Sequence, residues 1–350
     1  MRSKARFIGL LTVFLLVAAA CGDDDDAATT SEASGTTATT ATTAAPADAL
    51  RIALVLPGSA NDGGFNQLAF ESLALLEEEF GAETAFVEST PVNEYVKAYE
   101  DYANDGYDIV IGQGFQFGEV AAEVGPNYPD TLFLVTNNPA TSGPNLQGLQ
   151  PASQHAAYVA GVAAGHASES GKVGGIGGQP FPVVVAQIEA FRLGVLSVNP
   201  DADVTLTYLG SFDDVEKGKE TARAMISDGV DVIYHIADSA GIGVIQATDE
   251  EGVLVIGWGV DQTELAPDAV LTSQIVDQRL LILEVVRTIV DGDFSGEQRF
   301  FGLDTPVLDM APVRVVDADL AATIETAIDE TTEGIIGGTI EVPFIAEPQN

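Results

Sequence analysis

Short apolar runs alternate with amphipathic segments along the chain from Leu50 onward. Nearly continuous apolar strands separated by helices are typical of a parallel sheet that helices cover on both faces. The first expected strands span residues 51–57, 83–89, 108–114 and 131–137, and the helices between them span 65–80, 92–104 and 117–124. This part of the sequence predicts a doubly wound α/β unit.

The same alternation begins again near Lys172, with expected strands at 172–178, 203–211, 231–238 and 253–261. Two successive units of similar size predict an α/β protein with two parallel-sheet lobes and a cleft between them.

Ligands of such sheets bind beyond the carboxyl ends of the strands, so the loops at those ends are the candidate binding segments. These loops span residues 58–66, 115–119, 210–214, 239–243 and 258–262. They contain aromatic, carboxylate and amide side chains but almost no basic residue. We therefore expect a neutral or weakly basic planar ligand rather than a phosphate or a carboxylate.

The N-terminal segment has the pattern of a signal peptide over residues 1–20. A short basic head precedes an apolar run at 7–20, which is too short to span a bilayer comfortably and ends in small residues just before Cys21. Small residues directly ahead of a cysteine resemble a bacterial lipobox, although an ordinary signal peptide with an incidental cysteine is the alternative. We expect Cys21, the only cysteine, to be acylated and to tether the protein to the extracytoplasmic face of the cell membrane.

Residues 21–49 are expected to form a disordered linker. Four aspartates lead into a Thr/Ala/Ser stretch that lacks large apolar residues and so cannot offset its chain entropy by burial. The chain as a whole has 14 basic and 53 acidic residues. Nucleic acid and anionic lipid surfaces would repel it, so neither is an expected partner.

No catalytic or metal-binding constellation is present in the sequence. The three histidines, His155, His166 and His235, lie on different segments without metal-ligand spacing. The glycine clusters at 112–118 and 174–178 lack both the GxGxxG spacing and the lysine of a phosphate loop. We expect no enzyme activity, no metal and no cofactor, and we expect His235 to be a core residue of its strand.

Several segments, taken in order, resemble the basic-membrane-protein (BMP) family of ABC-transporter solute-binding lipoproteins, whose known members bind purine nucleosides or related bases. The segments are NDGGFNQLAF (61–70), DGYDIVIGQGFQFGEV (105–120), YPDTLFLVT (128–136), AAYVAGVAAGHASESGKVGGIGG (156–178), YLGSFDD (208–214), DVIYHIADSAGIGV (231–244) and VLTS (270–273). The resemblance implies the type I periplasmic-binding-protein fold, in which the chain crosses the hinge three times. We place these crossings near Leu149, Ile275 and Asp304, which assigns 50–149 and 276–304 to the N-lobe and 150–275 and 305–345 to the C-lobe.

The resemblance also implies a set of ligand-binding residues. In such proteins a purine is stacked between aromatic side chains, which would be Phe70 from the N-lobe and Phe212 from the C-lobe. Asn61 and Asp62 would meet the edge of the base, and Glu119 is a further candidate for that edge. Stacking of a base on an aromatic ring contributes about 1–3 kcal/mol.

Three further phenylalanines, Phe65, Phe115 and Phe117, could lie either at the cleft or in the interior of the protein. Phe65 is a candidate for the cleft, although helical spacing favours a core position. Either Phe115 or Phe117 is expected to face the cleft or the adjacent helix, and the sequence does not decide between them.

The sequence departs from the family pattern where the ribose would bind. Gly259 stands where the family has an aspartate, and Val276 stands where it has a lysine, while Asp261 is retained. Either the ligand carries no sugar, or other groups such as Asn66, Ser239 or Trp258 hold the ribose. We favour an altered ribose site in which Trp258 fills part of the space.

Together these patterns predict an extracytoplasmic, lipid-anchored solute-binding protein of an ABC importer. Its expected partners are a purine nucleoside or base and an ABC permease in the membrane. A sugar or small-metabolite receptor of the same fold, and a ligand-sensing lipoprotein without transport, are the alternatives. A nucleoside-processing hydrolase would need a base or metal cluster that the sequence does not supply.

Overall fold

The structure is a computed structural model that describes residues 49–349. The expected signal peptide, Cys21 and the linker up to residue 48 lie outside the described residues. No helix among the residues described combines the length and the apolar character of a membrane span.

The first half of the fold is built on a mainly parallel sheet in the order β12-β6-β4-β3-β1-β2, and the short β5 pairs with β6 in the antiparallel sense. Its strands are β1 (Arg51–Val55), β2 (Glu83–Val87), β3 (Ile109–Gly112), β4 (Leu132–Thr136), β5 (Ser142–Gly143), β6 (Leu146–Pro151) and β12 (Arg299–Phe301). Its helices are α1 (Phe65–Phe80), α2 (Tyr95–Asn104), α3 (Phe117–Val124) and α8 (Gln278–Val290), with short 3₁₀ turns η1 (Val92–Glu94) and η2 (Gly125–Asn127).

Side chains of β1 point alternately to the two faces of the sheet, and both faces are buried, so the strand is apolar at every position from 52 to 55. Ile52 and Leu54 pack in the cluster that contains the apolar residues of α1 and α8. Ala53 and Val55 point to the opposite face, into the cluster formed with the aromatic residues of α2 and α3. Because helices cover both faces, every β1 side chain between 52 and 55 is buried.

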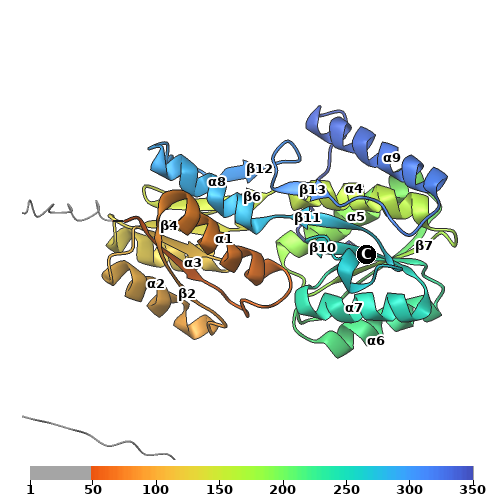
Figure 1. The fold of residues 1–350 in the computed structure, drawn as a ribbon, viewed down its shortest axis with the longest axis horizontal. Helices are drawn as coiled ribbons and strands as arrows, with labels where there is room; N and C mark the ends of the chain where they lie inside the picture. Colours follow the sequence, from red (N-terminus) through yellow and green to blue (C-terminus); the bar gives the residue numbers. More distant parts are fainter. Residues whose placement is uncertain (1–48, 350) are drawn as a thin grey trace, which may run out of the picture. The chain divides into compact units, whose positions relative to one another are not determined.

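The second half repeats this plan on a sheet in the order β13-β11-β10-β9-β7-β8, in which only β13 is antiparallel to its neighbour. Its strands are β7 (Lys172–Gly177), β8 (Asp203–Tyr208), β9 (Val232–Ile236), β10 (Leu254–Gly259), β11 (Val270–Val276) and β13 (Leu308–Met310). Its helices are α4 (Ser153–Ala167), α5 (Pro182–Val198), α6 (Val215–Ser227), α7 (Asp238–Glu251) and α9 (Ala318–Ile336), with the 3₁₀ turn η3 (Thr263–Leu265). Helices α4 and α5 pack together, as do α6 and α7, and α9 lies against α4 (Figure 1).

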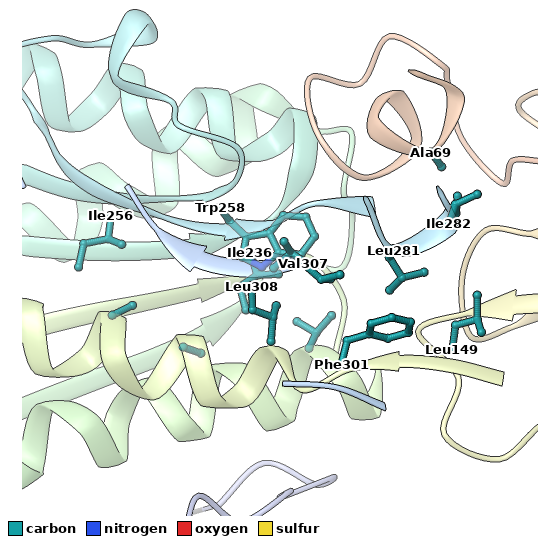
Figure 2. Packing of buried hydrophobic residues seen from close by; sticks show 14 of the residues in the cluster. Ala69, Leu149, Ile236, Ile256, Trp258, Leu281, Ile282, Phe301, Val307 and Leu308 are labelled. Carbon is teal, nitrogen blue, oxygen red and sulfur yellow. The ribbon is translucent and has the colours of Figure 1, made fainter. Parts of the chain in front are cut away.

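The chain passes between the two sheets three times: after β6, after β11, and between β12 and β13. One apolar core continues through these passages. Figure 2 shows Phe301 and Leu281 between Leu149 of the first sheet and Trp258 of the second, and all four side chains belong to one buried cluster. The expected fold, with two doubly wound lobes joined by three crossings, is confirmed.

Candidate functional site

A cavity of about 500 Å³ lies between the carboxyl ends of the two sheets. Its lining comes from residues at or after the carboxyl ends of β1, β2, β3, β4 and β6 in the first lobe and of β7, β8, β9 and β10 in the second. The loops at the carboxyl ends of both sheets therefore meet at one place, as expected for ligand sites of doubly wound sheets.

Aromatic side chains form much of the cavity wall. The first lobe contributes Phe65, Tyr95 and Phe115, the second contributes Phe181, Phe212 and Trp258, and Phe344 comes from the C-terminal segment. The ring centroids of Phe115 and Phe181 lie 5.4 Å apart, and those of Phe181 and Phe212 lie 6.0 Å apart. These three rings form a continuous aromatic contact from one lobe to the other.

The polar part of the lining consists of carboxylates and neutral groups. The carboxylates belong to Asp62, Asp213 and Asp238, and the side-chain amides belong to Asn66, Asn137, Gln116, Gln150, Gln154, Gln179 and Gln187. No lysine, arginine or histidine is among the described residues that line the cavity. This charge pattern suits a neutral or weakly basic ligand that donates hydrogen bonds, and it disfavours an anion.

Asp62 caps the N-terminal end of α1. Its carboxylate accepts hydrogen bonds from the backbone N–H groups of Gly64 at 3.0 Å, Asn66 at 2.8 Å and Gln67 at 3.0 Å. The side-chain amide of Asn66 donates to the same carboxylate at 2.7 Å. Asp62 thus occupies the helix end with its own negative charge, at a position that would otherwise attract an anionic ligand.

Asp238 opens α7 on the opposite lobe with a backbone φ of +45°, a conformation that few residues other than glycine adopt. Burial raises the pKa of its carboxyl well above the usual range, the nearby carboxylates of Asp62 and Asp213 raise it further, and the backbone N–H of Phe65 acts in the opposite direction. The hydroxyl of the next residue, Ser239, donates across the cleft to the backbone oxygen of Asp62 at 3.2 Å. The N-terminal ends of α1 and α7 therefore meet at the cavity, each with a carboxylate.

Two buried acceptors in the lining have no hydrogen-bond partner. They are Oδ1 of Asn66 and Oε1 of Gln150. Buried polar atoms are almost always paired, so these two acceptors are candidate partners for a ligand N–H or O–H, and each side chain must turn its oxygen towards the cavity to bind one.

A buried network fixes the indole of Trp258. Its Nε1 donates to Oε1 of Gln187 at 3.0 Å, and the same oxygen accepts from Nε2 of Gln274 at 3.1 Å. Gln274 also donates to the backbone oxygen of Ser153 at 3.0 Å. The oxygen of Gln187 that accepts from the indole is itself held by Gln274, which is held in turn by the backbone of Ser153. Trp258 therefore forms a rigid wall of the cavity.

Five of the residues expected from the sequence lie together in the lining of this cavity: Asp62, Phe65, Asn66, Phe212 and Trp258. Phe65 was open between cleft and core, and the structure places it at the cavity. His235 is a buried core residue, as expected, with Nε2 3.0 Å from Oε1 of Gln262, and burial lowers its pKa to about 4.

The structure places Phe70, Phe117 and Glu119 away from the cavity lining, which corrects their expected positions. Phe70 pairs with Phe86 at 4.7 Å in a separate surface groove, because five residues turn a helix by about 140° from the direction of Phe65. Phe117 is fully buried against Tyr95, so Phe115 is the member of that pair that reaches the cavity. Glu119 is exposed on α3.

Asn61, Gly259 and Asp261 also lie outside the lining. Asn61 is exposed in the loop before α1. Asp261 is exposed and forms an ion pair with Arg314 at 3.1 Å, so its carboxylate faces away from the cavity. Gly259 has a φ of +89°, and a side chain there would lie 3.9 Å from the Cα of Gly64 in the other lobe. Gly259 therefore lies at the contact between the two lobes and not in the cavity lining.

Several lining residues were not identified from the sequence. Asp213 lies within a loop that the carboxyl-end rule selects, whereas Phe181, Gln150 and Gln187 lie in or beside a helix or strand that carries no motif. Phe344 lies in the segment after the last helix, where no periodic pattern draws attention to it.

A family model matches residues 49–345 of the chain, and its description is Bmp, ABC transporter substrate-binding protein PnrA-like. Basic membrane protein A1 of Borrelia garinii subsp. bavariensis is 30% identical over 85% of this chain and 89% of that protein. The ABC transporter nucleoside-binding protein BmpA of Lactococcus lactis subsp. cremoris is 28% identical over 84% of this chain and 89% of that protein. A purine-binding protein of Brucella abortus is 26% identical over 85% of this chain and 83% of that protein.

Among solved structures, an ABC transporter solute-binding protein from Conexibacter woesei is similar with a TM-score of 0.69 and 26% identity, covering 85% of this chain and all of that one. Together with the two sheets and three crossings, this likeness identifies the type I periplasmic-binding-protein fold.

Proposed function

Because this chain belongs to the Bmp family of ABC transporter substrate-binding proteins, we propose that it binds a purine nucleoside or purine base between its lobes and delivers it to an importer. Membership confirms the resemblance seen in the sequence. Members are substrate-binding proteins and not enzymes, they act outside the cytoplasm, and they work with a small-molecule ligand and a membrane permease.

The observation that carries the proposal is the composition of the cavity. Flat aromatic side chains from both lobes, among them Phe65 and Phe212, suit a planar ring system. The unpaired oxygens of Asn66 and Gln150 suit ring or exocyclic N–H groups and sugar hydroxyls, which are donors. Two relatives, a nucleoside-binding protein and a purine-binding protein, support the same chemistry by what their names say they bind.

The charge of the site favours a nucleoside over a nucleotide. Asp62 and Asp238 place carboxyl groups at the N-terminal ends of α1 and α7 beside the cavity, and no basic side chain of the described lining offsets them. A phosphate would meet the acidic side chains of Asp62, Asp213 and Asp238 there without a basic group to offset its charge. The altered ribose site expected from the sequence is retained in the proposal, with Trp258 as one of its walls.

Calorimetric titration of adenosine and guanosine into the Cys21→Ala chain tests the site, with Phe65→Ala and Phe212→Ala as variants. Each variant should weaken binding by about five- to a hundredfold, because one stacking ring is removed. Phe70→Ala is the matched control on the same helix, and it should bind like the parent. Equal affinities in all four proteins would contradict the proposed site.

We also propose that Cys21 carries a lipid that tethers the protein outside the cell; the support is the sequence pattern of residues 1–21. On detergent phase separation, the wild-type protein should enter the detergent phase, and Cys21→Ala should stay in the aqueous phase. Identical partitioning of the two proteins would contradict the anchor.

A further inference from the structure

The C-terminal segment after α9, residues 341–349, turns back to the cavity without forming a helix or strand. Val342 packs against the main apolar core, and the backbone N–H of Gln349 donates to Oε1 of Glu189 at 2.7 Å. Phe344 lies between these two anchor points and lines the cavity. We propose that this segment is a wall of the ligand site and that Phe344 contacts the bound ligand.

The anchor of the segment is built into the same helix that forms part of the cavity. Glu189 of α5 is only 1% exposed, and its second carboxylate oxygen accepts from Nε of Arg192 at 2.9 Å. The buried carboxylate of Glu189 is therefore paired with Arg192 through Oε2, and its Oε1 holds Gln349 of the C-terminal segment. Val184 and Gln187, less than two turns earlier in α5, line the cavity. Helix α5 thus positions both the cavity wall and the segment that carries Phe344.

Phe344 itself is 43% exposed, although it is a large apolar side chain held beside an aromatic cavity. Val342 and Gln349 are held on either side of it along the segment, so the ring is kept near the cavity at little cost in chain entropy. A planar ligand that fills the cavity can cover the exposed part of the ring. Phe344 then adds an aromatic contact to the ligand from a segment that belongs to neither sheet. A substitution at this position can therefore change ligand preference without disturbing the core of either lobe.

This inference rests on the proposed function for the identity of the ligand, but one readout is independent of it. Trp258 is the only tryptophan of the chain, it lines the same cavity, and it is 7% exposed. Acrylamide quenching of its fluorescence therefore reports how well the cavity is covered in the absence of ligand.

The experiment compares Phe344→Ala, Phe344→Tyr and a chain that ends at Ile340, all in the Cys21→Ala background. Phe300→Ala is the matched control, because Phe300 is 61% exposed on β12 and lines no part of the cavity. For Phe344→Ala and for the shortened chain, the quenching constant should rise at least about twofold. The adenosine dissociation constant should rise about five- to a hundredfold, as for loss of one stacking ring. Phe344→Tyr and Phe300→Ala should keep the parent values of both.

Unchanged quenching and unchanged adenosine affinity in the shortened chain would overturn the inference. If the parent protein binds no purine, the proposed function fails, whereas the quenching comparison still decides whether the segment covers the cavity. Thermal melting of each variant, followed by circular dichroism, shows whether the variant is folded. In a folded variant, a higher quenching constant means that the cavity is less covered. If the shortened chain does not fold, Phe344→Ala against Phe344→Tyr decides, and equal behaviour of these two would overturn the proposal.

Discussion

At the scale of single residues, Asp238 combines the most unusual features of the site. It holds a left-handed backbone conformation, lines the cavity, and lies near two other carboxylates, Asp62 and Asp213. Backbone strain and a raised pKa at one residue are typical of functional positions rather than of positions selected for stability. Sequence reasoning could not identify it, because a single aspartate among 53 acidic residues carries no signal until its surroundings are known.

Asp238→Asn should stabilise the free protein at neutral pH. The pKa of Asp238 is higher in the folded than in the unfolded chain, so the ionised carboxylate opposes folding and the protonated one does not. The difference in free energy of unfolding between variant and wild type should therefore be small below about pH 4, near the ordinary pKa of aspartate, and should grow as pH rises towards the folded-state pKa. Urea unfolding at a series of pH values measures it. A difference that does not change with pH would contradict the raised pKa.

At the scale of helices and strands, much of the fold could be predicted from apolar periodicity. The helices expected at 65–80 and 117–124 are present with those bounds, and the eight expected strands are present in shorter form. Strands β5, β6, β11, β12 and β13 were not predicted. β6 contains a glycine and a proline, and β5, β12 and β13 have two or three residues each, so they form only because a neighbouring strand is already in place. In β11 the apolar run is interrupted by Thr272, Ser273 and Gln274, which are buried all the same.

Close contact between α4 and α5 depends on glycines, and Gly194→Ala tests it. A methyl group at 194 would lie 2.0 Å from the backbone oxygen of Tyr158, so one helix must move. We expect a loss of about 1–3 kcal/mol in the free energy of unfolding, as for other overpacked cores. Gly337→Ala is the control, since its φ of −75° suits alanine and its nearest neighbour is at 3.1 Å. Chemical denaturation of both variants measures the effect, and equal stabilities would refute the tight contact.

At the scale of the whole binding protein, the lobes meet where the loop before α1 contacts the start of α7. Ser239 bonds to the backbone of Asp62, and Gly259 lies opposite Gly64. In a receptor that closes around its ligand, such contacts belong to the closed form. The sequence predicted the two lobes and the loops that meet, but it misplaced Phe70, Glu119 and Asp261. Which face of a helix or loop points to the cleft depends on how the lobes are oriented, and a local pattern does not carry that information.

Ser239→Ala removes the hydrogen bond between lobes without changing the cavity lining. The ligand affinity should fall by roughly two- to tenfold, in line with one neutral hydrogen bond, and the loss should appear as faster dissociation. Stopped-flow measurement of adenosine release tests this. Thr263→Ala is a control hydroxyl removal in the same lobe, and it should leave the release rate unchanged. An equal release rate in Ser239→Ala and wild type would show that this contact does not hold the lobes together.

The central claim, a cavity for a neutral purine compound, is tested most directly by thermal unfolding against a panel of ligands. Adenosine or guanosine at about a hundred times its dissociation constant should add about 2.7 kcal/mol of stability and raise the melting temperature. Pentoses and the corresponding nucleoside monophosphates should have little effect, and comparison of base with nucleoside measures the contribution of the ribose. A shift with a sugar or a nucleotide, and none with any purine base or nucleoside, would contradict the account.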